Sequence, residues 1–177
     1  MKRYATFLRG INVSGHNIVK MDVLKELFAM PGIKNIVTYI QSGNVIFDTK
    51  ATDNAALERK IEKQLHKELG LPIRALVRSL EEIEQVIAAN PFTDIPEDDN
   101  RKLYVTFLET IPAADKATAL LALCSNGDEL MQISGSSLYF LSPSYGKTKF
   151  SNNFVEKKLG VAATTRNWAT LNKVIGL

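Results

Sequence analysis

Apolar residues along this chain follow two patterns, one typical of helices and the other typical of strands. Between residues 57 and 69, apolar side chains recur at every fourth position, which predicts a helix over 53–69 that ends at Gly70. Short apolar runs rich in β-branched and aromatic residues, such as 3–8 and 103–108, are typical of strands. The polar stretch 41–44 lies between two such runs and predicts a hairpin turn.

The patterns give the same order of elements twice. In the first half we predict strands at 3–8, 35–40, 45–48 and 73–77, helices at 21–30 and 53–69, and a further helix from the capping box that Ser79 and Glu82 form. In the second half we predict strands at 103–108, 129–133, 137–141 and 161–165, helices at 113–123 and 151–159, and a last helix capped by Asn167.

The sequence itself is repeated as well. Residues 4–8, Tyr-Ala-Thr-Phe-Leu, return at 104–108 as Tyr-Val-Thr-Phe-Leu, and residues 73–87 return at 161–175 without a gap. Strand, helix, strand, strand, helix, strand is the ferredoxin-like (βαββαβ) order. We therefore predict an α+β protein of two duplicated ferredoxin-like units, each followed by an extra helix, with antiparallel sheets in the order 4-1-3-2.

The predicted domains are a first ferredoxin-like repeat at 1–90, a linker at 91–101 that is rich in proline and acidic residues, and a second repeat at 102–177. No apolar run approaches the roughly 20 residues that span a membrane. The start of the chain lacks the features of a signal peptide, so we expect a cytoplasmic protein. Cys124 ends an apolar helical run, which favours a buried structural thiol.

Loop length separates the two copies. Residues 9–20 form a long connection rich in glycine and asparagine, whereas the matching connection at 109–112 is short. In the predicted sheet order the long loop lies at the same sheet end as the turn 41–44, which makes the pair a candidate binding site. The alternative is a loop held by its own side-chain hydrogen bonds. The candidate ligand-binding residues of this first cluster are Arg9, Asn12, Ser14, Gly15, Gln41, Ser42 and Asn44.

Charge points to a second cluster. The net charge is only +3, but residues 147–177 carry six basic residues and one acid. The loop after the third strand of the second copy and the exit of its fourth strand lie at one sheet end, so Lys147, Lys149 and Arg166 are expected to converge. The candidates here are Tyr145, Lys147, Lys149, Arg166, Asn167 and Trp168. The alternatives are that Trp168 is a core residue, since Leu80 matches it in the repeat, and that Arg166 is a cap or ion-pair partner.

Other chemistries find little support in the sequence. The glycines of 10–15 have the spacing of a P-loop, but His16 and Asn17 stand where that motif needs Lys and Ser or Thr. The two histidines have no cysteine or carboxylate at a metal-ligand spacing, so we predict no metal and no cofactor. No residue can be assigned as a nucleophile or a general base.

Three motifs carry a family resemblance: Leu-Arg-Gly-Ile-Asn-Val at 8–13, Thr-Tyr-Ile-Gln-Ser-Gly-Asn-Val-Ile-Phe at 38–47, and Thr-Arg-Asn-Trp-Ala-Thr at 165–170. With them the chain resembles, over essentially its whole length, the bacterial family called "domain of unknown function 1697". The resemblance implies an α+β fold with two ferredoxin-like halves. It implies no reaction, because the family has no established activity.

The function that these patterns favour is the binding of an anionic ligand: a nucleotide, another phosphate-bearing small molecule, or nucleic acid. The basic residues of both clusters would contact phosphate, and Tyr145 or Trp168 would stack on a base. Two alternatives stay open. One is an enzyme that acts on a small phosphorylated substrate in a pocket around Arg9, His16 and Gln41. The other is a protein-interaction or oligomerisation module, present as a monomer or a weak homodimer.

Overall fold

The structure, a computed structural model, describes residues 1–13, 15–95, 101–124, 128–143 and 145–177. The chain forms two compact units, Met1–Glu84 with Lys173–Leu177 and Gln85–Asn172. Part of the predicted linker, residues 96–100, lies outside the described residues, and the division at 91–101 stays a prediction.

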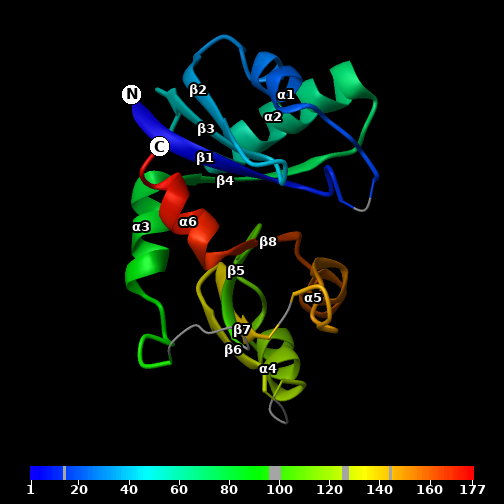
Figure 1. The fold of residues 1–177 in the computed structure, drawn as a ribbon, viewed down its shortest axis with the longest axis vertical. Helices are drawn as coiled ribbons and strands as arrows, with labels where there is room; N and C mark the ends of the chain where they lie inside the picture. Colours follow the sequence, from blue (N-terminus) through cyan, green and yellow to red (C-terminus); the bar gives the residue numbers. More distant parts are fainter. Residues whose placement is uncertain (14, 96–100, 125–127, 144) are drawn as a thin grey trace. The chain divides into compact units, whose positions relative to one another are not determined.

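The first unit has the predicted order of elements (Figure 1). Its elements are β1 (Lys2–Arg9), α1 (Met21–Leu27), β2 (Ile33–Tyr39), β3 (Asn44–Thr49), α2 (Asn54–Leu69) and β4 (Arg74–Ser79), and the extra helix α3 (Leu80–Ala88) follows. The sheet has the order β2-β3-β1-β4 with antiparallel neighbours, which is the predicted 4-1-3-2 order read from the other edge.

The second unit repeats this arrangement. Its elements are β5 (Lys102–Leu108), α4 (Ala114–Ala122), β6 (Leu130–Ser134), β7 (Ser137–Ser142), α5 (Asn152–Leu159) and β8 (Ala163–Asn167), followed by the extra helix α6 (Trp168–Val174). The sheet order is β6-β7-β5-β8, again antiparallel throughout. The duplicated ferredoxin-like α+β fold is confirmed.

Each unit buries a hydrophobic core between its helices and one face of its sheet. In the first unit, Leu57, Ile61 and Leu65 of α2 are buried, as their spacing predicts, and they share a core cluster with residues of β1 and β3. In the second unit, Val155 and Leu159 of α5 occupy the corresponding core. These clusters join the helices to the sheet in each unit.

The predicted glycine ends of α2 and α5 and the capping box of α3 are confirmed. Gly70 and Gly160 adopt left-handed backbone conformations at the ends of α2 and α5. At the capping box, the Ser79 N–H donates to Glu82 Oε2 at 2.6 Å, and the Glu82 N–H donates to Ser79 Oγ at 3.2 Å. Burial opposes ionisation of Glu82, but hydrogen bonds from Ser79 and from Asn54 hold the pKa of Glu82 below its ordinary value.

Most element bounds differ from the prediction by one to three residues, and two of these differences have a local cause. Helix α1 ends at Leu27 rather than at Met30, because the Ala29 N–H already donates to the carbonyl of Glu26, three residues back, and no longer follows the α-helical pattern. Strand β8 begins at Ala163 rather than at residue 161, since Gly160 ends the preceding helix and the chain needs two further residues to enter the sheet.

Glutamates of the long helices close one edge of each sheet. The Val77 N–H donates to Glu58 Oε1 at 2.8 Å, and the Ala75 N–H donates to Glu62 Oε1 at 2.9 Å. In the second unit the Ala163 N–H donates to Glu156 Oε1 at 2.9 Å. These carboxylates accept from the outward N–H groups of β4 and β8, which are edge strands, so those groups are not open to another strand.

Candidate ligand-binding site

The structure brings the long loop and the hairpin turn of the first cluster together. Asn12 Nδ2 donates to the Val19 carbonyl at 3.0 Å and to the Gln41 carbonyl at 2.8 Å, and Asn12 Oδ1 accepts from the Val19 N–H at 2.8 Å. Asn17 Nδ2 donates to the Gly10 carbonyl at 2.8 Å. The two asparagine side chains therefore fasten the loop to itself and to the turn.

Hydrogen bonding within the turn also engages Asn44. This side chain is buried, and its Nδ2 donates to the Tyr39 carbonyl at 2.9 Å and to Ser42 Oγ at 3.0 Å. Arg9 is half-buried at the end of β1, and Gly15 is exposed with φ at +78°. Ser14, also a candidate, lies outside the described residues.

The exposed side chains around this loop and turn are partly apolar. Val13 is 58% exposed, Ile18 73% and Ile40 47%. Ile40 also has φ at +49°, a left-handed conformation that costs a β-branched residue strain energy. The described part of the cluster is thus a hydrogen-bonded loop whose asparagine side chains bond to the backbone, with exposed apolar side chains beside them.

Two lysines of the second cluster line a hollow of about 420 Å³ in the second unit. The hollow is lined by Asp128, Glu129, Ser142, Pro143, Lys147, Thr148 and Lys149. Lys149 Nζ lies 5.1 Å from the centre of the Phe150 ring, a cation–π distance. Because two carboxylates face the same space as the two ammonium groups, the lining has no net charge.

Arg166 does not line this hollow. It is buried, and its Nη1 donates to Thr164 Oγ1 at 2.9 Å and to the Thr165 carbonyl at 2.8 Å. Burial lowers the pKa of the Arg166 guanidinium to about 10, although the nearby Tyr145 acts in the opposite direction. The Tyr145 hydroxyl donates to Thr165 Oγ1 at 3.1 Å, and its ring centre lies 5.4 Å from that of Tyr104.

The last two candidates lie at the start of α6. Asn167 caps this helix as predicted, because its Oδ1 accepts from the Thr170 N–H at 2.8 Å. Trp168 is half-buried, and its carbonyl accepts from Asn172 Nδ2 at 2.9 Å. Asn167 thus has a structural role as a helix cap, and contact of either residue with a ligand stays a prediction.

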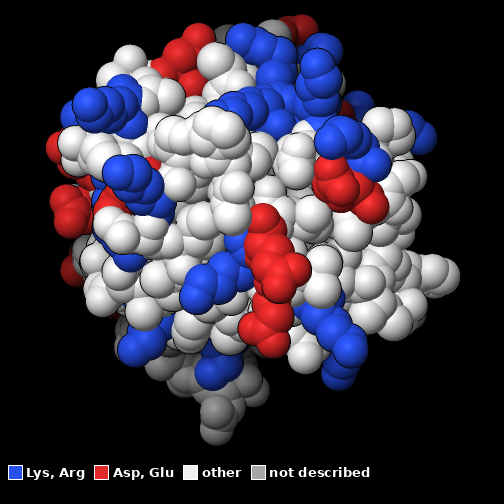
Figure 2. Space-filling view, turned by 90° about the horizontal axis from the view of Figure 1, so that it is seen from above, with Lys and Arg blue, Asp and Glu red and all other residues white. Residues whose placement is uncertain are grey.

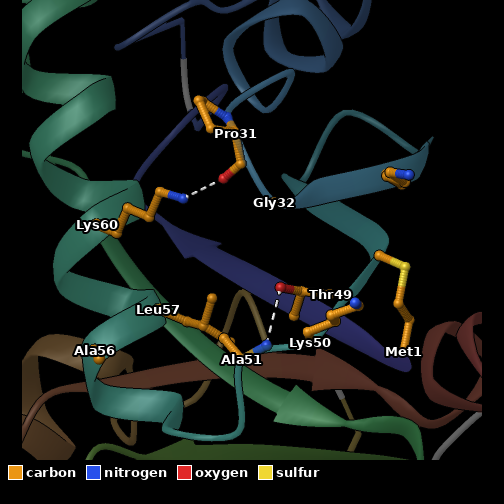
Figure 3. Close-up of a pocket in the computed structure, with 10 residues that line it drawn as sticks. Met1, Pro31, Gly32, Thr49, Lys50, Ala51, Ala56, Leu57 and Lys60 are labelled. Atoms are coloured by element: carbon orange, nitrogen blue, oxygen red, sulfur yellow. Dashed lines mark hydrogen bonds between the residues drawn. The ribbon is translucent and has the colours of Figure 1, made fainter.

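Sequence reasoning missed a hollow of about 370 Å³ in the first unit (Figure 3). It lies where the chain leaves β3 and enters α2. The lining residues are Met1, Pro31, Gly32, Lys34, Thr49, Lys50, Ala51, Ala56, Leu57 and Lys60. Three of them are lysines from three different segments, and none is acidic. These lysines are far apart in the sequence, so no sequence motif contains them. Each lysine taken alone is typical of an ordinary solvated side chain.

None of the three lysines of this hollow has a carboxylate at ion-pair distance among the described residues, although the register of β2 and β3 sets Lys34 opposite Asp48. Lys60 Nζ donates to the Pro31 carbonyl at 2.6 Å, a neutral acceptor (Figure 3). Lysine and arginine side chains are also spread over the surface in Figure 2, most densely along one border. The charged side chains among the described lining residues of the hollow are therefore all lysines.

Two other kinds of site receive no support. Within the described ranges, no group of three histidine, cysteine or acidic side chains is arranged to hold a metal ion. No helix among the described residues is long and apolar enough to cross a membrane. The thiol of Cys124 is buried as predicted, its Sγ lies 3.4 Å from the Glu129 carbonyl, and burial raises its pKa, with Glu129 adding to the effect.

Comparison with known proteins places this architecture in a family. Residues 1–139 match the family described as "Protein of unknown function (DUF1697)". The chain belongs to this family. The match includes two of the three motifs that carried the resemblance, those at 8–13 and 38–47, and it confirms the family that the sequence indicated.

A solved structure shares the fold of this DUF1697 protein. It is described as the structure of conserved bacterial protein SP0830 from Streptococcus pneumoniae. The two chains are 24% identical, with a TM-score of 0.73, and the alignment covers 99% of this chain and 97% of the other. No curated protein matches the sequence. The comparisons thus establish the fold and the family, and the family is one of unknown function.

Proposed function

We propose that this DUF1697 protein binds a small organic anion in the lysine-lined hollow of the first unit. The observation that supports this most directly is the lining itself, which brings Lys34, Lys50 and Lys60 around one concavity without a carboxylate. A concave site in which like charges gather without counter-ions favours a ligand of the opposite charge.

The sequence also favoured an anionic ligand, but it predicted that the residues of the two loop clusters would bind it. In the first cluster, the Asn12 and Asn44 side chains already use their amide groups on the protein backbone. In the second cluster, Asp128 and Glu129 face the same space as Lys147 and Lys149, which weakens the attraction for an anion. The hollow of the first unit has neither disadvantage.

Binding is favoured over catalysis by the chemistry of the same lining. Its side chains include no histidine, cysteine or carboxylate that could act as a nucleophile or general base. The hydroxyl of Thr49 accepts from the Ala51 N–H at 3.2 Å and is the one hydroxyl among these residues. Apart from the lysine amines, the described lining residues therefore offer charge and shape rather than a reactive group.

The test is a calorimetric titration with pyrophosphate, adenosine monophosphate and octanoate, which cover charge with and without an organic body. The triple variant Lys34→Gln, Lys50→Gln, Lys60→Gln should lose at least about tenfold in affinity for every anion that the unaltered protein binds, since three cations near the ligand are removed.

A matched control removes the same charge elsewhere in the unit. Lys20, Lys25 and Lys67 are exposed and do not line the hollow, and Lys67 lies about two helical turns from Lys60. Their triple replacement by glutamine should leave affinity within about twofold, because distant exposed charges are screened. If no anion binds, or if both triple variants weaken binding equally, the hollow is not the site and the proposal fails.

A second candidate function is self-association through the loop tip of the first unit, favoured by the exposed side chains of Val13, Ile18 and Ile40. Sedimentation equilibrium of the unaltered protein and of Ile18→Lys separates the two cases. A dimer that Ile18→Lys dissociates supports the interface, whereas a monomer at high concentration removes it.

A further inference from the structure

The hollow of the first unit has walls that are apolar apart from its lysines. Leu57 is buried beside Ala51 and Ala56, and Pro31 and Met1 complete the wall (Figure 3). The lysine side chains add their aliphatic stems to this surface, since a lysine at a rim keeps only its ammonium group in water. A ligand body that fills the space therefore meets hydrocarbon on most sides.

Directional polar groups are scarce in the same lining. Thr49 Oγ1 already accepts from the Ala51 N–H, and the Pro31 carbonyl already accepts from Lys60 Nζ. No asparagine, glutamine or acidic side chain is present to read the edge of a base or the hydroxyls of a sugar. No aromatic ring is present to stack on a base.

These features lead to a specific class of ligand, resting on the proposed function of the same hollow. We propose that its ligand is an amphipathic anion: an aliphatic chain that lies against Leu57 and the alanines, with a carboxylate or phosphate head held by the lysines. The volume of about 370 Å³ lies at the lower end of small-molecule pockets, which suits a chain of medium length. A nucleotide would bury its polar base edges without partners, which costs free energy.

The inference predicts how affinity depends on chain length. Titration with butanoate, hexanoate and octanoate should show affinity that rises about fourfold for each added methylene, the increment expected when a CH₂ group leaves water. The uncharged analogue 1-octanol should bind at least about tenfold more weakly than octanoate, since it cannot use the lysines.

A larger side chain placed in the hollow tests where the hydrocarbon chain of the ligand lies. Ala56 lines the hollow and Ala55, its neighbour in α2, does not, and both are exposed on the helix. Ala56→Leu should weaken octanoate binding at least about tenfold while leaving butanoate within about threefold, because the added side chain occupies space that only the longer chain needs. Ala55→Leu should leave both affinities unchanged.

The outcomes separate this inference from the proposed function. Binding of adenosine monophosphate or pyrophosphate that depends on the three lysines, with a flat chain-length series, overturns the amphipathic ligand and keeps the anion site. A chain-length series that does not respond to Ala56→Leu places the hydrocarbon elsewhere and overturns the inference as well. Absence of any lysine-dependent binding overturns both.

Discussion

Gly43 is the position where the long loop of the first unit closes on the hairpin turn. Its φ is +78°, and a Cβ added there would lie 2.7 Å from Ile11 Cδ1 and 2.9 Å from Leu8 Cβ. The backbone has little room to withdraw, because the Leu8 N–H donates to the Gly43 carbonyl at 2.9 Å. Gly43→Ala therefore introduces both a strained backbone and a steric overlap.

The two costs can be separated with a second glycine of the same unit. Gly15 also has φ at +78°, but nothing lies within 4 Å of a Cβ built on it. Gly15→Ala should lose only the backbone term, about 1–2 kcal/mol of the free energy of unfolding. Gly43→Ala should lose that term and a further 1–3 kcal/mol or so from overpacking, about 2–5 kcal/mol in all.

The assay is urea unfolding followed by circular dichroism, with Ile11→Ala added to each background. Because Ile11 supplies two of the three overlapping atoms and Leu8 the third, Gly43→Ala should cost less in the Ile11→Ala background, with a coupling of about 1 kcal/mol or more. Equal losses for Gly43→Ala and Gly15→Ala, or strict additivity with Ile11→Ala, would refute the close packing of loop and turn.

Three further predictions use the same unfolding measurements. Thr6 Oγ1 is buried without a hydrogen-bond partner among the described residues, whereas its counterpart Thr106 shares a 2.7 Å hydrogen bond with Thr165. Thr6→Val should therefore stabilise the protein by about 1 kcal/mol and Thr106→Val should destabilise it by a similar amount; the same sign for both would contradict this. The lowered pKa of Glu82 means that its contribution is present at neutral pH and is lost as the pH falls below 4.5, the ordinary glutamate value. Glu82→Gln should thus be less stable at pH 7 and lose less on acidification, and parallel pH profiles would speak against it. Because burial raises the pKa of Cys124, its thiol should react with a disulfide reagent at least about tenfold more slowly in the native state than in urea, and equal rates would show an accessible thiol.

The fold could be predicted from the sequence because its signals are local and occur twice. The spacing of Leu57, Ile61 and Leu65 fixes one face of α2, and the glycines after both long helices mark their ends. The repeat between 73–87 and 161–175 then shows that the two halves have the same order of elements, so the prediction for each half supports the other. Sheet order followed from the ferredoxin-like pattern, which permits few alternatives.

The candidate site was predicted less completely because it depends on tertiary contacts. The sequence placed Asn12 near Gln41 correctly, but it could not show that the Asn12 side chain would spend its hydrogen bonds on the backbone. Arg166 has a basic counterpart, Arg78, and both are buried, which matches the structural alternative rather than an exposed phosphate contact. The lysine hollow carried no sequence signal, since its residues come together only when α2 packs on the sheet.

Differences in element length between the two copies explain why the hollow belongs to the first unit. Helix α2 has 16 residues and α5 has 8, and both end at a glycine in the left-handed conformation. When those glycines are matched, the first eight residues of α2 have no helical counterpart in α5, and they include Ala56, Leu57 and Lys60 of the hollow.

The long loop shows the same kind of divergence. The Gly43 carbonyl and the Ser136 carbonyl accept equivalent hydrogen bonds, from the N–H groups of Leu8 and Leu108, so the two turns correspond. In the first copy Ile11 is 1% exposed and packs against the turn, which only glycine permits, whereas its counterpart Ile111 is 73% exposed and the turn carries a serine. The order of elements that both copies share thus accounts for the fold. The longer α2 and the longer loop of the first copy account for the features that a ligand could use. Substitutions in the hollow should therefore change binding with little loss of stability, whereas substitutions at Gly43 should do the reverse.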